Sequence, residues 1–267
     1  MPPDKLEGPP SEVNPAWGKL MKSYNLIQKI MNKAVLLLNR DGPRKDKASN
    51  KVFAVGFNKT GTTSLDALFK SLGLTAYHGV KWRTCDDLEL LRSYDCFSDG
   101  IPKDLPYLDR MFPNSKFILQ VRDLDTWIYS RLSHIERLKE CNKYEGGSLW
   151  DDTETSIKYW ITQRNDHHLF VLSYFSGRPS DLLIVNFIRD ASASTRISRF
   201  LGYGGIHKGP MKNINTKKDN LSKYKVMLKK CIEELGISES ELNYDILCPS
   251  QIKNAMRDIF PVDTSML

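Results

Sequence analysis

The hydrophobic pattern of the chain alternates between short apolar runs and longer amphipathic stretches. Residues 52–55 (VFAV) form an apolar run that stops at a glycine, and residues 61–72 then carry apolar side chains three and four positions apart. These apolar residues are Leu65, Leu68, Phe69 and Leu72. A short run rich in β-branched and aromatic residues is typical of a buried strand, and the second spacing is typical of a helix. The sequence therefore predicts a strand, a loop and a helix, in this order.

The same alternation continues toward the C-terminus. Further strands are predicted at residues 74–77, 95–98, 116–121 and 181–187, and further helices at residues 86–92, 105–111, 124–138, 151–173, 191–201, 218–235 and 250–260. The run KFILQV at 116–121 is almost wholly apolar, as expected for a central parallel strand that is covered on both faces. Strands that alternate with helices predict an α/β fold with a central, mostly parallel sheet flanked by helices.

The first fifty residues differ in composition from the rest. Residues 1–16 are polar and rich in proline, which is typical of a disordered N-terminus. Residues 17–50 are predicted to form an amphipathic helix (17–38) followed by a basic linker. The helix either packs on the domain that follows or makes peripheral contact with a membrane surface. The α/β domain, with a helical C-terminal part, is then expected over residues 51–267.

Charge and cysteine content narrow the class of protein. The formal net charge is +7, but residues 1–51 hold ten Lys/Arg and five Asp/Glu, so the predicted domain is nearly balanced. A nucleic-acid partner is therefore not expected, because such domains concentrate basic residues on the folded part. The five cysteines are scattered, without a C-x-x-C pair, and no run spans a bilayer. A complete chain of this kind is expected in the cytoplasm, with peripheral membrane contact as the alternative.

The loop GFNKTGTTS, residues 56–64, carries the chemistry. A loop between a strand and a helix N-terminus directs backbone N–H groups and the positive end of the helix dipole at a bound anion, and we expect this anion to be a phosphate. The loop is not a Walker A motif, which requires G-x-x-x-x-G-K-[ST]. Gly56 and Gly61 have the spacing of that motif, but Thr62 stands in place of its lysine, and the lysine of this chain, Lys59, lies inside the loop.

The displaced lysine resembles the 5′-phosphosulfate-binding loop of sulfotransferases that use 3′-phosphoadenylyl sulfate (PAPS), whose pattern is approximately P-K-[ST]-G-T-T. A second motif agrees with the first. These enzymes carry an arginine at the end of a central strand and a serine eight residues later, and Arg122 and Ser130 fall at that separation here. Over residues 51–215 the chain thus resembles a sulfotransferase domain with a three-layer, P-loop-like fold.

The resemblance implies transfer of a sulfuryl group from PAPS to an acceptor hydroxyl or amine, without a metal. Lys59 would neutralise charge on the leaving group, and Arg122 and Ser130 would hold the 3′-phosphate. The acceptor would be a small molecule or a carbohydrate, and the oligomeric state is left open. The residues expected to bind PAPS are Asn58, Lys59, Thr60, Gly61, Thr62, Thr63, Ser64, Arg122, Ser130 and Lys208.

Two residues at predicted strand ends are candidates for the general base that the acceptor needs. Asp99, in the segment SDGIP, resembles the aspartate of an Asp-x-Pro segment in one branch of the family, although one extra residue precedes the proline here. His78 follows Tyr77, as histidines do in that branch, and imidazole titrates near neutral pH. We expect Asp99 to be the base and His78 to orient it or the acceptor.

Several features leave alternatives open. Ser64 stands where many cytosolic members have a tryptophan that stacks on adenine. Four aromatic residues, Trp82, Tyr107, Trp160 and Tyr174, either line the acceptor site or belong to the core. The pair His167-His168 is expected on a helix surface. The competing functions are a P-loop small-molecule kinase, which would need Mg²⁺ and a Walker A lysine, and a non-catalytic nucleotide-binding adaptor.

Overall fold

The computed structural model describes residues 50–141, 152–204 and 222–251. The predicted N-terminal segments 1–16 and 17–38, the linker up to residue 49, Lys208 and the end of the helical tail lie outside the described residues. The chain divides into two units at Pro43 and Arg44, and every described residue belongs to the second unit.

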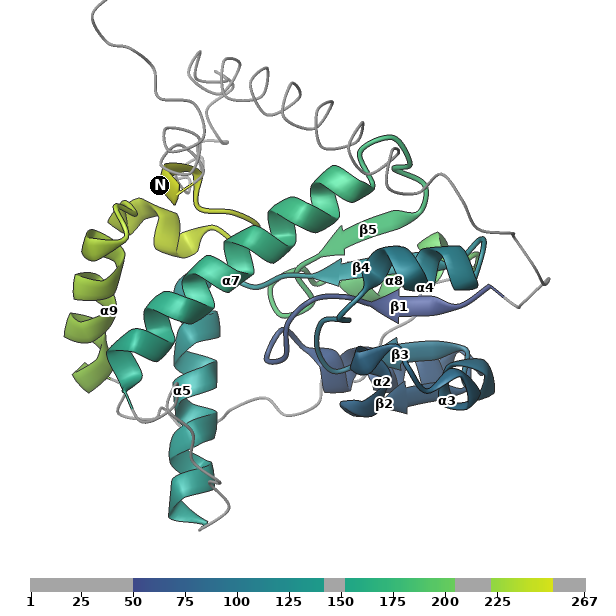
Figure 1. Ribbon diagram of the computed structural model, residues 1–267, viewed down its shortest axis with the longest axis horizontal. Coiled ribbons are helices and arrows are strands. Elements are labelled where there is room, and N and C mark those ends of the chain that lie inside the picture. Colours follow the sequence, from purple (N-terminus) through teal and green to yellow (C-terminus); the bar gives the residue numbers. More distant parts are fainter. Residues whose placement is uncertain (1–49, 142–151, 205–221, 252–267) are drawn as a thin grey trace, which may run out of the picture. The chain divides into compact units, whose positions relative to one another are not determined.

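A five-stranded, all-parallel sheet forms the centre of this unit (Figure 1). Its strands are β1 (Val52–Ala54), β2 (Ala76–His78), β3 (Cys96–Ser98), β4 (Lys116–Gln120) and β5 (Leu182–Val185). Their order across the sheet is β2-β3-β1-β4-β5. The predicted α/β class is confirmed, and the sheet is parallel throughout rather than mostly parallel. After β1 the chain forms β2 and β3 on one side of β1, and it then crosses to form β4 and β5 on the other side. The strand order therefore reverses between β1 and β4. Open α/β sheets bind ligands at such a point, beyond the carboxyl ends of the strands.

The helices lie close to their predicted positions. They are α2 (Thr62–Ser71), α3 (Leu88–Ser93), α4 (Leu105–Met111), α5 (Leu124–Glu140), α7 (Thr153–Tyr174), α8 (Ala193–Phe200) and α9 (Ser222–Glu234), with 3-10 turns η1 (Lys81–Thr84) and η2 (Glu239–Asn243). None of the helices in the described ranges is long and apolar enough to cross a membrane.

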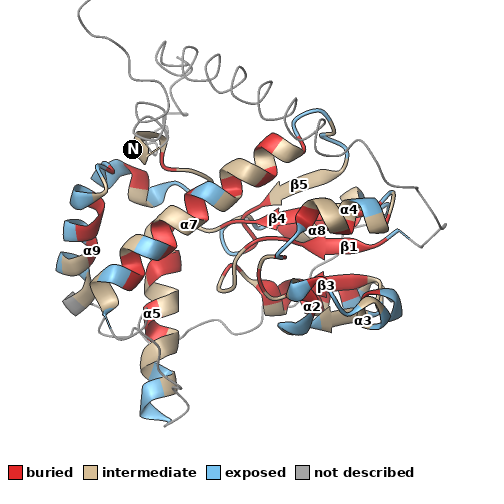
Figure 2. Cartoon of the chain, in the orientation of Figure 1, coloured by how far each residue is buried: buried red, intermediate tan, exposed pale blue. Residues whose placement is uncertain are grey.

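Alternation along β1 creates the two faces of the core, since successive side chains of a strand point to opposite faces. Phe53 packs with Phe97, Phe117 and Phe175 on the face toward α7. Ala54 packs on the other face, against residues of α2 and α8. The residues on both faces of the core are buried, as Figure 2 shows. A further apolar cluster joins α5, α7 and α9. The sheet therefore has helices on each face, and the loops that follow its strands begin at the carboxyl edge.

Gly56, directly beyond β1, passes very close to the neighbouring strand. Its N–H donates to Gln120 Oε1 at 3.0 Å, and Gln120 Nε2 donates back to its carbonyl at 3.3 Å. A Cβ at this position would lie 2.1 Å from the Gln120 carbonyl oxygen. Only glycine fits here, because the obstacle is backbone that a rotamer change cannot move.

We expect Gly56→Ala to destabilise the protein by about 3 kcal/mol or more, since overpacking against backbone forces the loop and β4 apart. The free energy of unfolding, measured by urea denaturation, gives the value. Gly177→Ala is the matched control, because a Cβ there meets nothing within 4 Å, and its effect should stay within about 0.5 kcal/mol. Equal stabilities of the two variants would contradict this account of Gly56.

Candidate functional site

The loop from Val55 to Gly61 joins β1 to the N-terminus of α2. Lys59 has a φ of 67° and Gly61 a φ of 94°, both in the left-handed region. Alternation of right- and left-handed backbone curves a loop so that its N–H groups face one concave side. Gly61 also precedes the first residue of α2, so the positive end of the helix dipole lies at the end of the loop. These two left-handed residues are compatible with the predicted anion loop, which stays a prediction.

Side chains that follow β4 hold this loop from the other side. Arg122 donates from Nη1 to the carbonyl of Lys59 at 2.9 Å, and from Nε to Thr126 Oγ1 at 3.1 Å. In α5, Trp127 donates to the Asn58 carbonyl at 3.0 Å and Arg131 donates to Asn58 Oδ1 at 2.7 Å. The structure thus brings Asn58, Lys59 and Arg122 together, although 63 residues separate the last two.

Arg122 keeps capacity for a ligand. A guanidinium has five N–H donors, and Arg122 makes two of the hydrogen bonds described above. The acidic neighbour that could have neutralised it, Asp123, is engaged by Arg189 at 2.7 Å. Burial lowers the pKa of Arg122, with Asp123 and Asp125 opposing that effect. The guanidinium is therefore a partly desolvated cation at the point where the strand order reverses.

Positive charge gathers around Lys59. The pKa of Lys59 is lowered to about 8, mainly by burial and secondly by the charge of Arg137. The charge of Asp99 opposes this change. Burial also lowers the pKa of His134, with the charge of Lys59 as the next cause. Arg131, His134 and Arg137 all belong to α5, whose preceding turns contact the loop. A site with several close cations and one carboxylate is stabilised when an anion enters it.

The two candidate bases lie at the carboxyl ends of neighbouring strands. Asp99 comes directly after β3 and has a left-handed φ of 91°. His78, the last residue of β2, contacts Ser98 in the adjacent strand, with 3.0 Å between Nδ1 and Oγ. Since β3 lies next to β1 and β2 lies one strand further away, Asp99 is the base candidate on the side of the loop, in agreement with its electrostatic effect on Lys59.

The remaining predicted ligands occupy the loop, the first turn of α2, and α5. Thr60, Thr62 and Ser64 are buried, and Gly61, Thr63 and Ser130 are partly buried. The hydroxyl of Thr60 donates to the Phe57 carbonyl at 2.5 Å, which closes the loop on itself.

The pair His167-His168 was expected on a helix surface, and this prediction is wrong. His168 is 1% exposed and contacts the Ile246 carbonyl through Nδ1, while His167 contacts the Val55 carbonyl through Nε2 at 2.6 Å. The ring of His167 also meets the edge of Phe57, with 5.4 Å between ring centroids. Burial lowers the pKa of His167 to about 4, so the ring is neutral near pH 7 and donates its Nε2 proton to Val55.

Gln120, Arg131 and His167 support the loop, and the sequence reasoning did not identify them. Trp127 and Arg131 are four residues apart and therefore lie on one face of α5. If one of them contacts the loop, the other is expected to contact it as well. Buried side chains recur along α7 at helical spacing and include His168; they are Ile157, Trp160, Ile161, Arg164, His168 and Val171. That period was a signal for a buried histidine.

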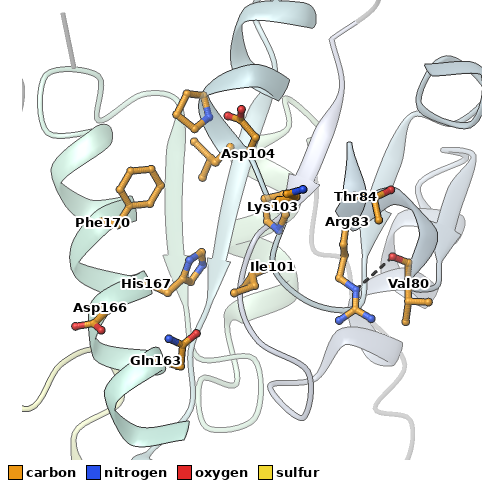
Figure 3. A pocket seen from close by; sticks show the side chains of 13 residues that line it. Val80, Arg83, Thr84, Ile101, Lys103, Asp104, Gln163, Asp166, His167 and Phe170 are labelled. Atoms are coloured by element: carbon orange, nitrogen blue, oxygen red, sulfur yellow. Dashed lines mark hydrogen bonds between the residues drawn. The ribbon is translucent and has the colours of Figure 1, made fainter. Parts of the chain in front are cut away.

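A cleft of about 970 Å³ opens next to His167 (Figure 3). One wall is α7, and the other comes from η1 and the connection between β3 and α4. Its lining residues are Val80, Arg83, Thr84, Ile101, Pro102, Lys103, Asp104, Leu105, Pro106, Gln163, Asp166, His167 and Phe170.

None of the four aromatic residues considered for the acceptor site lines this cleft. Trp82 and Trp160 are buried, Tyr107 packs against the core, and the hydroxyl of Tyr174 donates to Asp109 at 2.7 Å. The alternative that they belong to the core is the one observed.

Within the described ranges, no group of three or more His, Cys, Asp or Glu side chains could hold a metal ion. Comparison with models of known protein families found no match to the chain. A search of curated proteins found no match either.

The buried histidine gives a prediction for stability against pH. The folded-state pKa of His167 is about 4 and its ordinary value is 6.5, so the unfolded chain binds more protons between these values. The free energy of unfolding should therefore fall as pH falls from about 6.5 toward 4. In His167→Gln the amide can still donate to Val55 but cannot be protonated, so the fall should be smaller. Urea denaturation at several pH values measures both slopes, and identical slopes would refute the assignment.

Proposed function

We propose that the protein is a sulfotransferase that moves a sulfuryl group from PAPS to an acceptor hydroxyl or amine. The observation that carries the proposal is the contact between the Arg122 guanidinium and the Lys59 carbonyl in the loop after β1. The two residues belong to separate motifs of the sulfotransferase pattern, and the fold brings these motifs into one site. A donor that carries a phosphosulfate and a separate 3′-phosphate requires such a pair of cations.

The donor is held at both of its anionic ends. Backbone N–H groups of residues 60–63 and the Lys59 ammonium bind the 5′-phosphosulfate, as loops at helix N-termini do. Arg122 and Ser130 bind the 3′-phosphate, for which a guanidinium provides a fork of donors. The pKa of Lys59, about 8 before the donor enters, rises beside the bound anion, so Lys59 stays protonated when charge develops on the leaving group.

The transfer is an in-line displacement at sulfur. The acceptor oxygen or nitrogen forms a bond to sulfur, and the bond between sulfur and the bridging oxygen breaks. Adenosine 3′,5′-bisphosphate leaves with that electron pair, which Lys59 stabilises electrostatically. The proton of the acceptor passes to Asp99, the carboxylate beside Lys59. Sulfate ester or sulfamate and bisphosphate are the products.

Binding measurements separate this proposal from a kinase. We expect metal-independent binding of adenosine 3′,5′-bisphosphate by calorimetry, stronger than the binding of ATP with Mg²⁺. Arg122→Lys keeps the charge but loses the fork, and should weaken bisphosphate binding by about 30- to 100-fold, the value of hydrogen bonds between charged groups.

Arg199→Ala is the control for this measurement, because Arg199 is exposed at the end of α8. It should leave the dissociation constant unchanged. The proposal is contradicted if the protein binds ATP with Mg²⁺ more strongly than the bisphosphate, or if Arg122→Lys binds the bisphosphate as strongly as the unsubstituted protein does.

Turnover measurements test the base. Asp99→Asn should lower kcat for sulfuryl transfer by about 10²- to 10⁴-fold, the usual contribution of a general base, and leave bisphosphate binding intact. Asparagine tolerates the left-handed conformation at this position, so the backbone is preserved. Lys59→Ala should lower both transfer and bisphosphate affinity. Full turnover in Asp99→Asn would assign the base to His78 instead.

A further inference from the structure

We propose that the cleft between α7, η1 and the β3–α4 connection binds the acceptor, and that this acceptor is a polyhydroxylated molecule of the carbohydrate type. The inference rests on the proposed sulfotransferase function and adds the substrate class.

The cleft lies close to the carboxyl ends of β1 and β3. Ile101 and Pro102 line it, and they follow Asp99 and Gly100 directly in the chain. The guanidinium of Arg83 lies against Gly100, where an added Cβ would be 2.8 Å from Nη1. On the opposite wall, His167 holds the Val55 carbonyl at the end of β1. A molecule in the cleft therefore lies against segments close to the carboxyl ends of β1 and β3, reached through His167 on one wall and through Ile101 and Pro102 on the other.

Polar side chains on both walls have unused hydrogen-bonding capacity. Gln163 and Asp166 lie one helical turn apart on α7, and Lys103 lies on the facing connection (Figure 3). With the rest of the described chain, none of these three side chains forms a hydrogen bond or an ion pair; Lys103 and Asp166 are exposed at the mouth of the cleft, and Gln163 is partly buried. Partial burial raises the pKa of Asp166, although the residue as a whole is exposed. The cleft thus offers donors and acceptors together, with nothing in the described ranges that uses them.

This chemistry selects hydroxyl-rich ligands over flat aromatic ones. A sugar presents several O–H groups, each a donor and an acceptor, and a carboxylate, an amide and an ammonium can bind them in parallel. Its C–H face can pack on Phe170 and on the apolar residues Ile101 and Pro102. A phenol or a sterol would leave the polar side chains without partners, and sites of this kind reject ligands that lack the matching group. Phe170 is the only phenylalanine, tyrosine or tryptophan in the lining.

The volume agrees with such an acceptor. About 970 Å³ lies at the upper end of the range for small-molecule sites, which is about 300–1,000 Å³, and accommodates a disaccharide.

The test measures transfer from ³⁵S-labelled PAPS to two panels of acceptors. One panel holds lactose, cellobiose, trehalose and N-acetyllactosamine, and the other holds 4-nitrophenol, a sterol and an arylamine. We expect labelled product from the sugar panel. Asp166→Asn should raise KM for the sugar about tenfold, which corresponds to one lost hydrogen bond to a charged group, and the double variant Asp166→Asn/Gln163→Ala should raise it further.

Two readouts keep this inference separate from the proposed function. The dissociation constant of adenosine 3′,5′-bisphosphate should be the same in these variants as in the unsubstituted protein. Glu89→Gln on α3 is the matched control, an isosteric change of an exposed carboxylate outside the cleft, and should leave KM unchanged. If the bisphosphate does not bind, the sulfotransferase proposal fails, whereas the cleft can still be tested through direct binding of sugars.

Saturation-transfer difference NMR with the four sugars provides that direct test, because it needs no donor. Sugar signals that weaken in the Asp166→Asn/Gln163→Ala variant support the inference. Product from the phenol, sterol or amine panel alone overturns it, as does a sugar KM that these substitutions leave unchanged. Absence of both labelled sugar and sugar NMR signals also overturns it.

Discussion

Five hydrogen bonds from one segment, residues 120–131, hold the loop between β1 and α2. Gln120 makes two of them with Gly56, Arg122 makes one with Lys59, and Trp127 and Arg131 each make one with Asn58. Because β1 and β4 are neighbouring strands, this segment begins beside the loop without any long connection. The loop is therefore fixed by the sheet that precedes it and by the helix that follows β4. Anion binding needs this support, since N–H groups bind best when they are already oriented.

The residues that hold the loop also bring several positive charges together at a site where burial destabilises charged groups. Arg131 packs over Trp127 and Trp160, and burial lowers its pKa to about 10. Lys59 and Arg122 are also shifted toward their neutral forms by burial. A cluster of this kind costs stability in the free protein, and an anion recovers that cost on binding. Sites with such perturbed pKa values are often functional, because a purely structural role rarely requires several partly buried cations close together.

Much of the fold was accessible from the sequence, and the reasons are local. The apolar run 52–55 and the periodic segment 61–72 each identify their element, because a strand and a helix have different periods. The strand at 74–77 was placed two residues early, since β2 is a half-exposed edge strand with a weak pattern. The contact of Arg122 with Lys59 depends on strand order, which the hydrophobic pattern alone does not determine. The histidines of α7 were misplaced because their polarity outweighed the apolar period around them.

The central claim is that one site holds two separate phosphate groups, one in the loop and one at Arg122. Phosphorus NMR with adenosine 3′,5′-bisphosphate tests it most directly, because the 5′- and 3′-phosphates give separate resonances. We predict that both resonances shift on binding, without added metal, and that Arg122→Ala removes the shift of the 3′-phosphate while that of the 5′-phosphate persists at saturating ligand. Two resonances that stay at their free positions, or a 3′-phosphate shift that survives Arg122→Ala, would contradict the account.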